Sequence, residues 1–164
     1  MHDITSQSRR SPASVAGLAA AALLMSGFAA SGSANADEPP IYDGIVSGVA
    51  LGGYDPVAYF RQGQPVEGRA EFSLEWQGAE WRFASGENRA FFARDPEAYA
   101  PQYGGYCAWA VAENYTAHGD PQHWNIVDGR LYLNFNARIQ RRWERDIPGY
   151  ISSADANWPG VLSD

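Results

Sequence analysis

The clearest pattern along the chain is a regular alternation of apolar and polar residues in two places. In residues 72–83, large apolar side chains occupy alternate positions on both sides of Gln77-Gly78. In residues 123–133, a similar run is interrupted by Asp128-Gly129. A period of two places side chains on one face of a strand, and a glycine between two such runs permits a tight turn. Both segments are therefore predicted to form antiparallel β-hairpins, and Asp-Gly is a preferred hairpin turn.

Helix start signals lie between and after these hairpins. Asp55 precedes Pro56, and this pair favours a first helical turn because the carboxylate accepts free amide hydrogens and proline has none to offer. The predicted helices are residues 56–61, 86–95 capped by Ser85, 106–113, and 137–146 capped by Asn136 and stopped by Pro148, with a turn from Pro96 to Tyr99 and a last helical stretch in residues 148–159. The predicted fold class is α+β, with small antiparallel β-hairpins covered by short helices. No internal repeat is evident in residues 37–164.

The N-terminal residues form a different kind of segment. Arg9 and Arg10 precede an apolar run over residues 15–30, and small residues follow up to Ala34-Asn35-Ala36. This order is typical of a secretory signal peptide, and the run is too short and too rich in Gly and Ser for a transmembrane helix. We therefore predict that residues 1–36 are removed and that residues 37–164 form one domain, periplasmic or secreted, without membrane insertion. The arginine pair leaves both the general secretory route and the twin-arginine route open.

Charge and composition narrow the possible partners. The chain has a formal net charge of −7 and contains no lysine, and residues 37–164 carry ten arginines and eighteen carboxylates. A surface of this sign disfavours binding to nucleic acid and to anionic membranes. The absence of lysine excludes Schiff-base chemistry and a lysine general base. Cys107 is the only cysteine, so no disulfide forms within the chain.

Several motifs resemble the YHS domain family, in particular its small exported bacterial members. The resemblance rests on GYDPVAYF at residues 53–60, on a long stretch over residues 76–108 that contains RFASGENRA and YGGYCA, and on VDGRLYLNFN at residues 127–136. It implies a compact α+β fold related to zinc ribbons and treble clefs. It also implies an association with heavy metals, especially copper, which many members bind through cysteines.

The chain departs from this family where the metal ligands would lie. At the three positions where the resemblance implies ligand cysteines, this chain has Ala58, Ala84 and Asn88. Because alanine has no donor atom, the cysteine cage of the family cannot be built here. The resemblance therefore carries over the fold but not the metal site.

Three other residues are candidate metal ligands: Cys107, His118 and His123. The Gly-Asp-Pro turn at residues 119–121 would fold the chain back and bring the two imidazoles together. One thiolate and two imidazole nitrogens suit copper, or zinc with an open fourth position. The sequence therefore predicts a non-enzymatic binding module that holds a transition metal, copper in the first place, near Cys107.

Cys107 also admits two other interpretations. Free cysteine packs as a small apolar side chain, and the aromatic residues around position 107 suit a core. Alternatively, Gly104-Gly105 permit close approach of a ligand, and the chain is a cysteine-dependent enzyme. That enzyme needs a base and an orienting carboxylate, for which the candidates are His118, His123, Asp120 and Asp128. A structural or partner-binding domain without a metal is the remaining class.

Four arginines lie close together near the C-terminal end of the chain, at positions 138, 141, 142 and 145. Their spacing places them on one or two faces of the predicted helix. We expect a solvated helix face there, with the arginines paired to Glu144 and Asp146.

Overall fold

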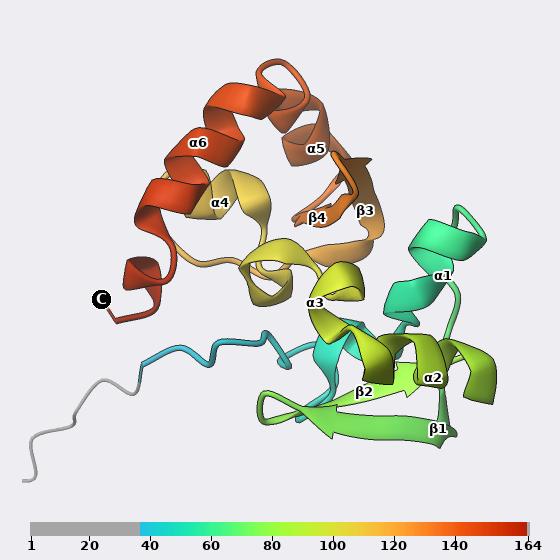
Figure 1. The fold of residues 1–164 in the computed structure, drawn as a ribbon. Helices are drawn as coiled ribbons and strands as arrows, with labels where there is room; N and C mark the ends of the chain where they lie inside the picture. The colour runs from blue at the N-terminus through green and yellow to red at the C-terminus, as the bar shows by residue number, and fades with distance from the viewer. Residues whose placement is uncertain (1–36, 164) are drawn as a thin grey trace, which may run out of the picture. The chain divides into compact units, whose positions relative to one another are not determined.

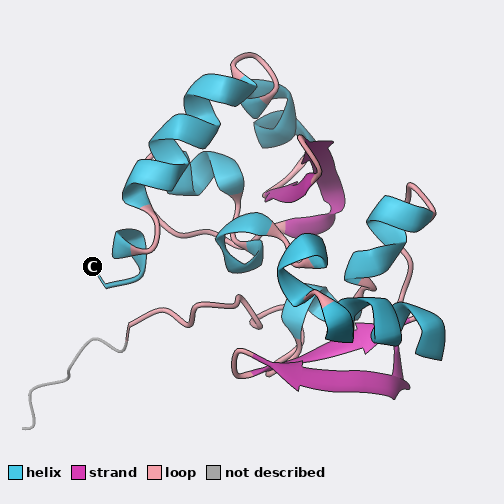
Figure 2. Cartoon of the chain, viewed as in Figure 1, coloured by secondary structure: helices cyan, strands magenta, loops and turns pink. Residues whose placement is uncertain are grey.

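The computed structural model describes residues 37–163, and the predicted signal peptide lies outside them. Short helices and two hairpins alternate along these residues (Figures 1 and 2). In chain order the helices and strands are α1 Pro56–Arg61, β1 Arg69–Trp76, β2 Ala79–Phe83, α2 Gly86–Arg94, α3 Pro96–Tyr99, α4 Ala108–Ala112, β3 Asp120–Val127, β4 Arg130–Asn134, α5 Ala137–Trp143 and α6 Ile147–Asn157. The predicted α+β class is confirmed.

Both predicted hairpins are present, each as its own two-stranded antiparallel sheet. The turn residues have left-handed backbones, with φ of +50° and +81° at Gln77 and Gly78 and of +50° and +74° at Asp128 and Gly129. Two successive positive φ values match the right-handed twist of the paired strands. Each hairpin also loses its regular register near the start of its first strand.

The helix caps follow the sequence signals, with one correction. The side chains of Asp55, Ser85 and Asn136 accept backbone N–H groups at the starts of α1, α2 and α5. Pro148, however, does not end the preceding helix, because α5 already ends at Trp143 and the proline lies in the first turn of α6. Proline is tolerated there because the first amides of a helix have no intrahelical acceptor. Among the described residues, no helix is long and apolar enough to cross a membrane.

The chain folds as two halves with the same order of elements, which corrects the expectation of no internal repeat; in the sequence the shared Gly-Gly-Tyr at residues 52–54 and 104–106 is a short trace of it. Residues 50–99 and 102–157 each contain a short 3₁₀ helix, a helix, a hairpin, a capped helix and a further helix. The 3₁₀ helices share an unusual backbone, with φ of +54°, +58° and +87° at residues 51–53 and of +55°, +61° and +88° at residues 103–105. The repeat is therefore one of backbone geometry, and the side chains at most matching positions differ.

Hydrogen bonds confirm which positions match. The Asp55 N–H donates to the Val66 carbonyl and the Cys107 N–H donates to the Ala117 carbonyl, both at 2.8 Å. In each half, the second glycine of the Gly-Gly pair accepts a hydrogen bond from the glycine N–H of the opposite segment. Asp55 and Cys107 therefore occupy the same place in the two halves, each between a Gly-Gly-Tyr turn and a short helix.

Each half has its own core, and a third cluster joins them. The first core is built on Trp81, Phe83 and Phe92, and the second on Tyr106, Tyr132 and Trp143, with smaller apolar side chains around each. The joining cluster consists of Leu51, Tyr59, Leu131 and Leu133. The hydroxyl of Tyr59 also donates to the carbonyl of Pro121 at 2.9 Å. The first 3₁₀ helix and α1 of the first half thus pack against β4 of the second half.

The matching glycines Gly52 and Gly104 test the importance of the two turns. A Cβ added at Gly52 meets the flexible side chain of Ile45 at 3.1 Å, whereas one at Gly104 overlaps the carbonyl oxygen of Pro40. We expect Gly52→Ala to lower the free energy of unfolding by about 1 to 2 kcal/mol, through the left-handed backbone alone. We expect Gly104→Ala to lower it by about 3 kcal/mol or more, because backbone atoms must also move. Urea unfolding followed by tryptophan fluorescence measures both losses. Equal losses would contradict the conclusion that the backbone of Pro40 packs against Gly104 more tightly than Ile45 packs against Gly52.

Candidate functional site

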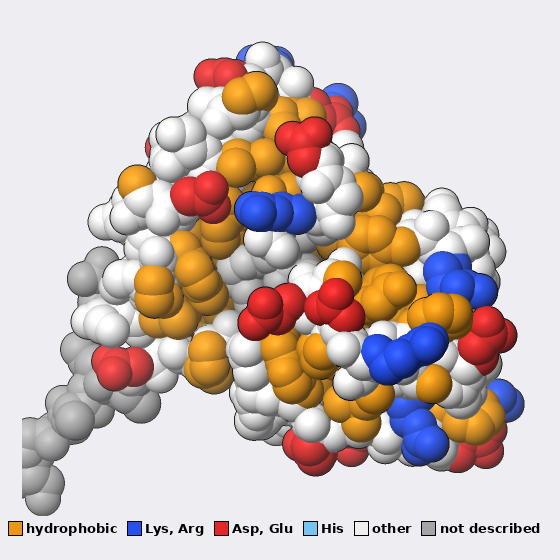
Figure 3. Space-filling model, in the orientation of Figure 1, with side chains coloured by type: hydrophobic (Ala, Val, Ile, Leu, Met, Phe, Trp, Pro, Cys, Tyr) orange, Lys and Arg blue, Asp and Glu red, His pale blue; other side chains and the backbone are white. Residues whose placement is uncertain are grey.

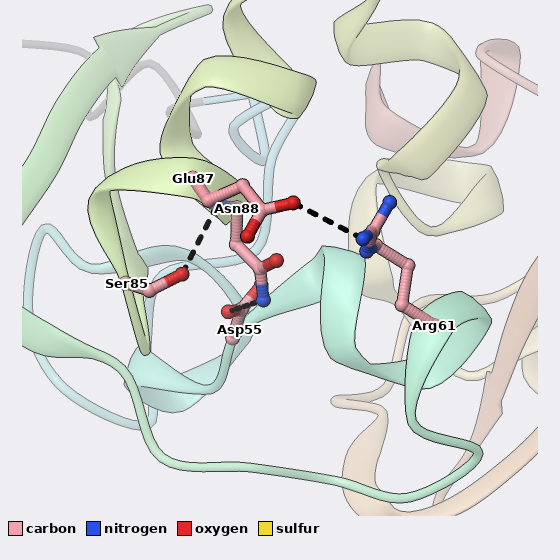
Figure 4. Close-up of polar contacts among 5 residues, drawn as sticks. All are labelled: Asp55, Arg61, Ser85, Glu87 and Asn88. Carbon is pink, nitrogen blue, oxygen red and sulfur yellow. Dashed lines mark hydrogen bonds and ion pairs between the residues drawn. The ribbon is translucent and has the colours of Figure 1, made fainter.

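The carboxylate of Asp55 is fully buried and accepts four hydrogen bonds, of which Figure 4 shows the one from Asn88. One oxygen accepts the N–H groups of Val57 at 2.8 Å and Ala58 at 3.3 Å. The other accepts the N–H of Ala84 at 2.8 Å and the side-chain amide of Asn88 at 2.7 Å. All four groups are donors, which is the environment that a buried charged oxygen pair requires.

These contacts bring together the three positions at which the family resemblance implies the cysteines of a metal site. Ala58, Ala84 and Asn88 all lie around the Asp55 side chain. Neither alanine offers a metal donor, and the amide of Asn88 is already bonded to the carboxylate. The residues present do not fit the metal of that family, and the site serves to fasten three chain segments together.

Cys107 holds the matching position in the second half, and its side chain is fully buried. The thiol donates to Oδ1 of Asn134, with 3.8 Å between sulfur and oxygen. Burial raises the pKa of the Cys107 thiol, and the backbone amides of Ala110, Phe135 and Trp109 that face the sulfur oppose this rise without cancelling it. A protonated, packed thiol is therefore the resting state at neutral pH.

The two histidines do not join the sulfur in a metal-binding group. The His118 ring packs against Phe135 and Tyr42, with ring centroids 4.5 and 6.1 Å away. His123 lies on β3, where its Nε2 is 3.9 Å from a carboxylate oxygen of Asp120. Within residues 37–163, no three His, Cys, Asp or Glu side chains lie together in a way that could hold a metal ion.

A pocket of about 410 Å³ opens beside Cys107. The buried side chains of Cys107, Ala110 and Ile139 form its inner wall. Its outer edge carries the exposed aromatic rings of Tyr115 and Phe135, which are 46% and 39% accessible. The remaining lining residues are Trp109, Ala117, Asn136, Arg138 and Arg142. An apolar wall with a few polar groups at its edge is the usual composition of a small-molecule site.

Polar groups of the pocket are coupled to one another. The Arg142 guanidinium lies over the Trp109 indole, 5.2 Å from the ring centroid. Partial burial, the Cys107 sulfur once it is ionised, and the Glu113 carboxylate raise the pKa of Tyr115, and Arg142 opposes them. The side chains of Tyr115, Cys107 and Arg142 therefore border the same pocket and influence one another electrostatically.

The arginines of this region are not paired as the sequence suggests. Within the described chain, none of the four arginines between positions 138 and 145 makes an ion pair. Glu144 accepts from the Asn125 side chain and Asp146 accepts from the Gly149 N–H. Basic and acidic groups are interspersed on the face shown in Figure 3. The chain is acidic overall, and Arg138 and Arg142, which carry no ion pair within the described residues and line the pocket beside Cys107, form a local exception to this.

Of the pocket residues, the sequence predicts only Cys107. Arg138 and Arg142 are separated by four positions, the spacing that places two side chains on one helix face, and this is the signal that points to a shared site. Tyr115 and Phe135 carry no such signal, because they come from loops that meet only in the folded chain. A second pocket, of about 450 Å³, is lined by both Glu97 and Arg130 and contains no thiol.

Comparisons with family models, with curated proteins and with solved structures gave no match to this chain. Function is therefore inferred from the geometry of the Cys107 pocket and of its counterpart at Asp55.

The Asp55 network yields a stability prediction. Asp55→Ala leaves buried N–H groups without an acceptor, and we expect the free energy of unfolding to fall by about 3 to 5 kcal/mol. The control is Asp146→Ala, which removes an exposed cap bonded to the Gly149 N–H and should cost about 1 kcal/mol. Urea unfolding of both variants measures the difference. A loss at Asp55 no larger than that at Asp146 would show that the network does not hold the first half together.

Proposed function

We propose that the chain is an exported, YHS-type binding module whose ligand occupies the pocket beside Cys107. The ligand class is a small molecule with an apolar, preferably aromatic body and one anionic group. The observation that carries this proposal is the combination, in one pocket, of an apolar inner wall, exposed aromatic rings and two unpaired guanidiniums. The secretory signal and the family motifs add an envelope or extracellular setting to the proposal.

Each part of the pocket has a separate role in this binding. The rings of Tyr115 and Phe135 offer faces on which an aromatic body stacks, and their exposure makes them available without rearrangement. Arg138 and Arg142 provide charge-assisted hydrogen bonds to a carboxylate, sulfonate or phosphate. The inner wall excludes water and strengthens those contacts. A neutral or cationic ligand of the same size lacks this part of the binding energy.

Two alternatives to this function start from the same thiol. A cysteine-dependent enzyme needs a base beside the sulfur, but the hydrogen-bond partner of the thiol is the amide of Asn134. Copper or zinc binding at Cys107, His118 and His123 remains a prediction of the sequence. The packing of the His118 ring between two aromatic residues gives it less support than the pocket has.

The binding proposal is tested with anilinonaphthalene sulfonate, a fluorescent aromatic anion, and with N-phenylnaphthylamine, its uncharged analogue. We expect the anion to bind the native protein and the analogue to bind at least about tenfold more weakly, which corresponds to about 1.4 kcal/mol for the charged contact. Arg138→Gln and Arg142→Gln should each weaken the anion by a similar factor. Fluorescence titration gives the dissociation constants.

The matched control is Arg141→Gln, which removes an exposed arginine of the same helix that does not line the pocket. This variant should bind the anion as the wild type does. Equal affinity for the two probes, or equal losses at Arg138, Arg141 and Arg142, would contradict an anion site in the pocket. Phe135→Ala should weaken both probes, because it removes a ring and no charge.

Metal binding is tested separately on the same protein. If the sequence prediction holds, the chain takes up about one Cu(I) or Zn²⁺ and both Cys107→Ala and His118→Ala lose it. Competition titration with a chromophoric chelator measures the uptake. Absence of uptake would remove the metal proposal and leave the pocket proposal untouched, since the two experiments use different residues and probes.

A further inference from the structure

The backbone amides that hold the Asp55 carboxylate have counterparts around Cys107. Val57 and Ala58, which donate to Asp55, follow it by the same number of residues as Trp109 and Ala110 follow Cys107. Ala84, the third backbone donor, comes directly after β2, and Phe135 comes directly after β4. The second half therefore repeats a cradle of three amides that, in the first half, holds two anionic oxygens.

A fourth donor completes each cradle. In the first half it is the side-chain amide of Asn88. In the second half the amide of Asn134 faces the sulfur, is fully buried, and has no hydrogen-bond partner for its Nδ2 within the described residues. A buried amide nitrogen without an acceptor is unfavourable, and half a turn of the amide group places it toward the sulfur. When the occupant of the cradle is a thiol, one donor, the Asn134 Nδ2, therefore has no acceptor.

A thiol is a poor occupant of such a cradle. Its sulfur is a weak acceptor, and the protonated group carries no charge for the amides to stabilise. A sulfinate, in contrast, has two charged oxygens on one atom bonded to Cβ, which is the arrangement of the aspartate carboxylate. All four donors would then have an oxygen to bind, as they do around Asp55.

We infer that Cys107 is a site of oxidation whose sulfinate is held by the second cradle as the carboxylate of Asp55 is held by the first. The inference does not depend on the ligand proposed above. The pocket beside Cys107 gives a small oxidant a route to the buried sulfur, and the oxidant class is a peroxide.

The chemistry proceeds in two steps. The thiolate attacks one oxygen of hydrogen peroxide, so that an S–O bond forms, the O–O bond breaks, and hydroxide leaves and takes the sulfenic proton as water. The sulfenate sulfur then attacks a second peroxide in the same way and gives sulfinate and water. Each step removes two electrons from sulfur and reduces one peroxide. Oxidation stops at this stage because the four donors of the cradle hold two oxygens.

Cys107→Asp tests the cradle directly, because aspartate has the shape of the sulfinate. We expect this variant to fold and to unfold at a higher urea concentration than Cys107→Ala. The matched control is Ala110→Asp. It keeps the backbone N–H of residue 110 in the cradle but places its carboxylate elsewhere in the same buried cluster, and it should unfold far more readily than the wild type. Cys107→Asp less stable than Cys107→Ala, or unfolded, would overturn the inference.

Peroxide treatment of the full wild-type chain provides a second, independent measurement. Peptide mass spectrometry should show the Cys107 peptide gaining two oxygen atoms and then holding that mass, and the oxidised protein should resist urea better than the reduced one. Because burial raises the thiol pKa, the reaction should accelerate with pH beyond the ordinary thiol range. The two methionines, Met1 and Met25, lie in other peptides and do not interfere. Passage to three oxygen atoms without a pause, or loss of stability on oxidation, would overturn the inference.

Discussion

The buried carboxylate of Asp55 is the interaction on which the first half of the structure depends. It accepts from two amides at the start of α1, from the amide that follows β2 and from Asn88 on α2. Two short helices and a two-stranded sheet are each too small to be stable alone. A single charged group with four donors fixes how they meet, and the exposed Arg61 and Glu87 pair adds a further contact between α1 and α2 (Figure 4).

The second half keeps the backbone of this arrangement and changes its occupant. Left-handed turns before Asp55 and Cys107 direct the chain in the same way, and the same inter-segment hydrogen bonds follow. The polar centre is replaced by a thiol among apolar side chains, and Ile139 stands where the first half has Asn88. This exchange joins the two proposals, because a cradle that suits an anion and a pocket edged by guanidiniums both lie at the substituted position.

In the proposed function, the distribution of charge accounts for the selectivity of the pocket. Acidic groups outnumber arginines along the chain, so an anionic molecule meets general repulsion over most of the surface. On α5 the balance reverses, because Ala137–Trp143 contains three arginines and no carboxylate. The proposed binding of an anion therefore depends on a few residues of one helix, and the apolar wall beside them would restrict the size and shape of the ligand.

By itself, the sequence determined the hairpins, most helix caps and the α+β class, since alternation, Asp-Gly and Asp-Pro act through local backbone preferences. It also identified Cys107 as the residue of chemical interest. The repeat, the cradle and the pocket were decided by tertiary structure. Matching positions such as Asp55 and Cys107 share backbone geometry but not side-chain type, and Gly-Gly-Tyr, which precedes both, is too short a motif to reveal the repeat by itself. His118 and His123 are close in sequence, yet the folded chain turns one toward aromatic rings and the other toward Asp120, because strand pairing fixes where each side chain lies.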